Sequence, residues 1–111
     1  MDIINQDFCF IGKKSKIIGD LVLNGPTHIG GEVEGNISIA DDSKLIIEPT
    51  AVIQGTIKGS TVEIYGVVHG DISARENLKV FPSATINGKL TAKSLKVLPG
   101  AKLNIIGHTK E

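Results

Sequence analysis

The sequence contains few aromatic residues, one cysteine and no tryptophan. Aromatic residues make up 4% of the 111 residues, so the hydrophobic 41% consists mainly of isoleucine, valine, leucine and alanine. The β-branched members of that group favour strands over helices. Because the single cysteine, Cys9, has no partner for an internal disulfide, we expect a protein from a reducing compartment.

A net charge and a long apolar run are missing as well. The formal net charge is zero, which argues against a nucleic-acid-binding protein because such binding depends on neutralising phosphates. No apolar run approaches the roughly 20 residues of a membrane-spanning helix. Residues 1–6 also lack the basic start and the apolar core of a signal peptide. A cytoplasmic protein is therefore expected.

Glycine, in contrast, is abundant, and five of the 13 glycines stand in one repeated pattern, aliphatic-x-Gly-x-aliphatic. The repeated glycines are Gly19, Gly35, Gly55, Gly70 and Gly88. A degenerate sixth copy covers residues 103–107, and successive copies begin 16, 20, 15, 18 and 17 residues apart. No GxGxxG or GxxxxGK[ST] motif opens a helix, which disfavours a phosphate-binding loop. The glycines are expected to relieve crowding or to allow a bend.

A second pattern interleaves with the glycines and supplies corners. Apolar pairs separated by one residue recur, and three copies are followed by Pro49, Pro82 or Pro99. Proline fixes φ and cannot donate to a strand ladder, so each proline marks a corner. Apolar residues alternate within each copy, which predicts short strands with one inward face. A repeat of about 17 residues predicts one coil of a β-solenoid, with about six coils in all.

Aliphatic residues also recur at intervals of six, for example from Val62 to Leu98, and this spacing predicts three sides for each coil. In such a solenoid no coil can bury its inward residues alone, and stacking buries them in one column. The predicted fold is therefore an all-β, three-sided parallel β-helix.

Two segments resemble the bactofilin family of bacterial cytoskeletal proteins: residues 10–21, FIGKKSKIIGDL, and residues 31–37, GEVEGNI. The resemblance implies a right-handed β-helix domain over residues 9–107, between an N-terminal tail of residues 1–8 and a C-terminal tail of residues 108–111. It implies a scaffold that polymerises end to end without nucleotide or cofactor. It also implies association with the inner face of the cell membrane, positioning of cell-wall or morphogenesis proteins, and support of cell shape.

An enzyme of another class is the alternative, namely a left-handed β-helix acyltransferase of the hexapeptide-repeat kind. The interval of six fits it, but only Ile11-Gly12 and Ile29-Gly30 follow its signature. Such enzymes need a general-base histidine. We expect His28 and His69 to point outward, and we place His108 in the tail.

Metal chemistry is not indicated by the sequence. Three scattered histidines and one cysteine lack the spacing of metal ligands. Asp41-Asp42 is expected to form a turn rather than a calcium site. We therefore expect a protein that is not an enzyme and that holds no metal.

The expected functional sites are the two ends of the rod, where open strand edges favour further pairing. No helix-length amphipathic segment covers either end in the sequence. The predicted polymerisation interface consists of Phe10, Ile11, Ile17, Leu98, Leu103, Ile105 and Ile106. Ile3, Ile4 and Phe8 are candidates for membrane contact, or for packing on the first coil.

The direction in which the rods join stays open at this point. Residues 1–57 carry four basic and eight acidic residues, and residues 58–111 carry eight basic and four acidic ones. Such a dipole would favour head-to-tail stacking. The family resemblance instead implies that like ends meet.

Overall fold

A computed structural model describes residues 9–40 and 42–109. Every regular element in those ranges is a β-strand, and every strand pairing is parallel. None of the described residues belongs to a helix long and apolar enough to cross a membrane. The strands are β1 (Cys9–Ile11), β2 (Lys16–Ile18), β3 (Leu21–Leu23), β4 (Thr27–Ile29), β5 (Glu32–Ile39), β6 (Lys44–Ile47), β7 (Val52–Ile64), β8 (Val67–Val80), β9 (Thr85–Val97) and β10 (Lys102–Thr109).

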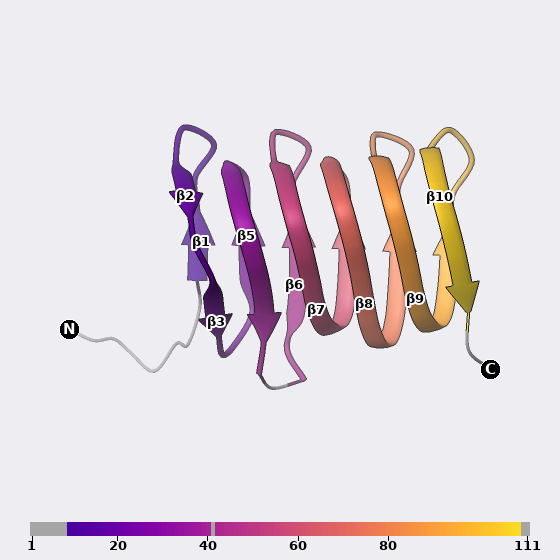
Figure 1. Ribbon diagram of the computed structural model, residues 1–111, viewed down its shortest axis with the longest axis horizontal. Helices are drawn as coiled ribbons and strands as arrows, with labels where there is room; N and C mark the ends of the chain where they lie inside the picture. The colour runs from indigo at the N-terminus through magenta and orange to yellow at the C-terminus, as the bar shows by residue number, and fades with distance from the viewer. Residues whose placement is uncertain (1–8, 41, 110–111) are drawn as a thin grey trace.

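The strands wind around one axis as six coils (Figure 1). We number them 1 to 6, over residues 9–23, 27–39, 44–59, 61–74, 77–92 and 94–109. In Figure 1 the near strands run downward and the far strands upward, while the chain advances from left to right. The winding is therefore right-handed, unlike that of the acyltransferase alternative. The predicted β-solenoid is confirmed.

Each coil has three straight segments, so the rod has three faces. Face A consists of β1, β4, β6 and residues 61–64, 77–80 and 94–97. Face B consists of residues 16–18, 32–34, 52–54, 67–69, 85–87 and 102–104. Face C consists of residues 20–23, 36–39, 56–59, 71–74, 89–92 and 106–109.

A column of aliphatic side chains fills the rod. In coils 2 to 5 the buried aliphatic residues are at most 4% exposed. The three aromatic residues whose side chains are described, Phe10, Tyr65 and Phe81, all lie outside this core. Tyr65 and Phe81 stack on the corner between faces A and B, with ring centroids 4.1 Å apart. Burial, and secondarily the Glu63 carboxylate, raise the pKa of Tyr65. The filled interior leaves no space for a ligand along the axis, so function must lie on the outside or at the ends.

The repeated glycines form the bend between faces B and C. Gly35, Gly55, Gly70 and Gly88 have φ between +140° and +145°, a region that side chains other than glycine rarely adopt. Each stacks on the glycine of the preceding coil, and a Cβ on Gly35 would lie 1.9 Å from the Gly19 carbonyl oxygen. Both proposed reasons for the repeat, a bend and relief of crowding, therefore apply to the same residues.

Candidate polymerisation interface

The aliphatic column is incomplete in the first and last coils. The inward residues that are only partly buried all belong to these two coils: Ile17, Leu21, Leu23, Leu95, Ala101 and Leu103. Their register partners inside the rod are fully covered; Val33 opposite Ile17 and Ile86 opposite Leu103 are both 0% exposed. The difference arises because a second coil covers the end residues on one side only.

Exposed large hydrophobic side chains show the same distribution. The four in the described part of the chain are Phe10 at 59%, Ile18 at 73%, Val22 at 73% and Val97 at 40%. Phe10, Ile18 and Val22 belong to coil 1, where each points outward from a different face, and Val97 belongs to coil 6. Coil 1 therefore presents an apolar ring around the rod, in addition to its half-covered inward residues.

Backbone pairing is open at both ends. Among the described residues, β1 pairs only with β4, β2 and β3 only with β5, and β10 only with β9. At the N-terminal edge Gly19 has φ of +132°, and a Cβ there would meet nothing within 4 Å. At the other edge, Ile105 stands in register with Gly88, so the glycine repeat stops at coil 6. Unpaired parallel edges of this kind template further strand pairing.

The structure brings most of the predicted interface residues to the ends, in different roles. Phe10 is exposed on face A, whereas Ile11 is 8% exposed and belongs to the core. Ile17 and Leu103 are half-buried inward residues. Ile105 and Ile106 lie in β10, but their side chains are outside the described part of the structure. The candidate membrane residues Ile3, Ile4 and Phe8 fall outside the described residues altogether.

Leu98 does not lie in the inward column, where the interval of six predicts it. It is half-buried at the outer corner between faces A and B, and its N–H donates to the Val80 carbonyl at 2.9 Å. Phe81 makes the equivalent bond to Ile64 one coil earlier. The interval of six fails here because the corner before coil 6 has one residue, Lys93, where the corner before coil 5 has two, Arg75 and Glu76. Val97 rather than Leu98 is therefore the register partner of the inward Val80.

The predicted interface did not include Ile18, Val22 or Val97. A signal was present for the first two: Ile18 directly follows an inward isoleucine, and Val22 stands between two inward leucines. Continuing the alternation through coil 1 would have placed both on the outside.

Two histidines on the sides of the rod each contact a side chain of the next coil. His69 is exposed with its Nδ1 3.0 Å from the Asn87 side-chain nitrogen, and His28 is half-buried with its Nδ1 3.1 Å from Glu48 Oε2. No group of three histidine, cysteine, aspartate or glutamate residues within 9–40 and 42–109 could hold a metal ion. The His69 contact joins a ring nitrogen to an amide nitrogen, and the His28 contact joins a ring nitrogen to a carboxylate oxygen.

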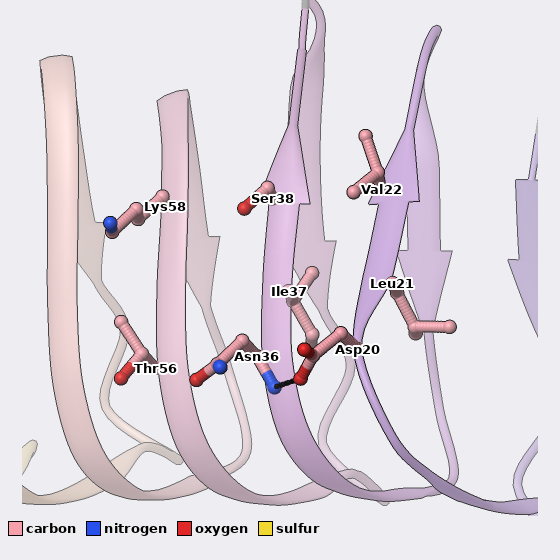
Figure 2. A pocket seen from close by; sticks show the side chains of 8 residues that line it. All are labelled: Asp20, Leu21, Val22, Asn36, Ile37, Ser38, Thr56 and Lys58. Carbon is pink, nitrogen blue, oxygen red and sulfur yellow. Dashed lines mark hydrogen bonds between the residues drawn. The ribbon is translucent and has the colours of Figure 1, made fainter.

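A hollow on face C spans coils 1 to 3 (Figure 2). It is lined by Asp20, Leu21, Val22, Asn36, Ile37, Ser38, Thr56 and Lys58. Asp20 Oδ1 accepts a hydrogen bond from the Asn36 backbone N–H at 3.3 Å, which ties coil 1 to coil 2. These eight residues include neither a histidine nor a cysteine.

A filled rod with apolar, unpaired ends has the architecture of a structural β-solenoid. The chain belongs to the bactofilin family: the family's model, described as polymer-forming cytoskeletal, matches residues 9–107. The chain is 27% identical over 97 residues to bactofilin BacP of Myxococcus xanthus (strain DK1622), a match that covers 87% of this chain and 40% of BacP. It is 29% identical over 91 residues to bactofilin BacO of the same organism, covering 82% of this chain and 71% of BacO. No solved structure matches the chain significantly.

Proposed function

We propose that this protein is a cytoskeletal scaffold whose rods polymerise end to end. The observation that carries the proposal is the confinement of exposed large hydrophobics and half-covered inward residues to coils 1 and 6. Membership of a family described as polymer-forming cytoskeletal supports it. End-to-end contact would cover both groups of side chains and pair the open strand edges.

The magnitudes are sufficient for assembly without a nucleotide. Fully burying one aliphatic side chain contributes about 1.5–3 kcal/mol. Several half-covered side chains at each end can therefore offset an association cost of about 4–15 kcal/mol. Both driving forces, apolar burial and strand pairing, are present in the folded rod and need no hydrolysis step.

Purified protein is accordingly expected to form filaments a few nanometres wide in buffer without nucleotide, because the rod itself measures 29 × 24 Å across. Negative-stain electron microscopy checks this, with and without added ATP or GTP. Discrete particles of fixed size under both conditions would contradict the scaffold function and favour a closed oligomer, as in the acyltransferase alternative.

We further propose that the scaffold acts in the cytoplasm at the inner face of the cell membrane and positions cell-wall or morphogenesis proteins. Ile3, Ile4 and Phe8 are the proposed lipid contacts, since short apolar segments can enter the interfacial region of a bilayer.

Removing residues 1–7, which deletes Ile3 and Ile4, is expected to abolish flotation with liposomes while leaving filament formation intact. The control is the full chain under the same conditions, with filament content of both samples verified by microscopy, because bare filaments also sediment. Flotation on a density gradient separates lipid-bound protein from bare filaments. Equal flotation of the two chains would contradict the membrane role of this segment.

A further inference from the structure

The last two coils carry only positive charge. Between Glu76 and Glu111 the chain has no acidic residue, and residues 77–109, which form coils 5 and 6 and the corner between them, contain five lysines. All five are exposed. We call them the lysine collar: Lys79, Lys89, Lys93, Lys96 and Lys102.

The collar surrounds the C-terminal end on every side. Lys79 and Lys96 stand on face A, Lys102 on face B and Lys89 on face C, while Lys93 lies at the corner between faces C and A. Lys79 and Lys96 are direct register partners, so two like charges lie on adjacent strands. Adjacent strands are separated by about 4.8 Å.

Internal carboxylates neutralise little of this charge. No ion pair of the described structure includes a collar lysine. Glu63 is the register partner of Lys79, but its carboxylate lies 3.3 Å from Lys44 Nζ. Lys102 stands opposite Thr85. Lys89 faces Asp71, an acidic register partner that forms no ion pair with another described residue.

The opposite end of the rod is also basic. Coil 1 contains Lys13, Lys14 and Lys16 against a single acidic residue, Asp20. Lys16 Nζ lies 3.9 Å from Glu32 and 3.8 Å from Glu34, which leaves the exposed Lys13 and Lys14 as the charges near the edge. The dipole expected from the two halves of the sequence is therefore not what the ends present.

Whichever end of a second copy it meets, the collar faces a basic coil. Electrostatic repulsion at such a contact extends over about 30 Å at 0.01 M salt and about 10 Å at 0.1 M. We propose that the lysine collar opposes end-to-end contact at low ionic strength, so that salt promotes filament growth. This inference depends on the proposed polymerisation but not on which ends meet.

The test is sedimentation of the full chain at 10 and 200 mM NaCl and constant protein concentration. The pelleted fraction is expected to rise at least about threefold, because salt screens the repulsion between like charges across the junction. A pelleted fraction that is constant or falls with salt would overturn the inference while leaving polymerisation intact. No pelleting at any salt would overturn both.

Charge variants separate the collar from a general effect of salt on apolar burial. Lys96→Glu is expected to pellet at 10 mM NaCl nearly as well as the parent does at 200 mM. Lys58→Glu makes the same change of charge on exposed face C of coil 3 and is expected to keep the parent's salt dependence. Thermal unfolding verifies that both variants are folded. If the pelleted fractions of the two variants depend on salt in the same way, the lysine collar is not the cause of the salt dependence.

Discussion

Gly55→Ala is expected to destabilise the rod by about 2–5 kcal/mol, a large share of the roughly 5–15 kcal/mol available to a typical domain. Gly55 has φ of +142°, and a Cβ there would lie 1.8 Å from the Gly35 carbonyl oxygen. The obstructing atom is backbone held in a strand ladder between coils 2 and 3, so it cannot move aside as a flexible side chain would. Denaturant titration followed by circular dichroism measures the change.

Two other glycines serve as matched controls for this prediction. A Cβ on Gly12 would meet only Phe10 Cε2, at an ordinary 3.7 Å, so Gly12→Ala is expected to change stability by less than about 0.5 kcal/mol. Gly19 has the same kind of backbone, with φ of +132°, but nothing lies within 4 Å of its Cβ position. Gly19→Ala is therefore expected to lower the free energy of unfolding by about 1–2 kcal/mol, the cost of the backbone conformation alone.

The order of the three variants decides between causes. Stability should fall from Gly12→Ala through Gly19→Ala to Gly55→Ala. If Gly19→Ala and Gly55→Ala are equally destabilised, the backbone conformation alone explains the repeat and the close stacking of coils contributes nothing. If Gly55→Ala is as stable as Gly12→Ala, the bend does not require glycine.

The same glycines explain how much of the fold the sequence predicts. The first aliphatic residue of each glycine pattern is predicted to point inward. The structure places these residues in register on face B, as Ile17, Val33, Ile53, Val68 and Ile86. Handedness could not come from this pattern, because a left-handed and a right-handed solenoid place the same residues inside.

The ends were predicted less well, for a physical reason. Interior coils mostly follow one rule, apolar inside and polar outside, because water covers their outer surface. Their outward apolar residues Ile46, Val52 and Val67 are half-buried rather than exposed. Coil 1 departs from that rule at Ile18 and Val22, which are apolar and point outward. A sequence pattern assigns apolar residues to the core by default. An apolar residue whose role is to contact another molecule is therefore predicted to point inward when it points outward.

Leu103→Arg is expected to leave the rod folded and to abolish filaments. Leu103 is a half-buried inward residue of coil 6, so an arginine there can extend into water in the single rod. In an end-to-end junction the same charge would be enclosed among apolar side chains, at a cost of several kcal/mol. Each 1.4 kcal/mol lowers the association constant about tenfold, so only short species should remain. Electron microscopy and analytical ultracentrifugation measure the outcome.

Neighbouring positions provide the controls. Asn104→Arg adds the same charge one residue later, at an exposed outward position, and is expected to keep its filaments. Both variants are compared at 300 mM NaCl, where added positive charge near the lysine collar is screened. Leu103→Asp lowers the net charge instead, and it should also abolish filaments if enclosure of a charge, rather than repulsion, is the cause.

Ile86→Arg completes the series, because Ile86 is the register partner of Leu103 one coil further inside and is 0% exposed. This variant is expected to lose the fold itself, since both neighbouring coils already cover the position and the arginine has no route to water. Moving the same substitution by one coil should thus change its effect from loss of assembly to loss of structure. Filaments of Leu103→Arg as long as those of Asn104→Arg would place the junction elsewhere than on the C-terminal coil.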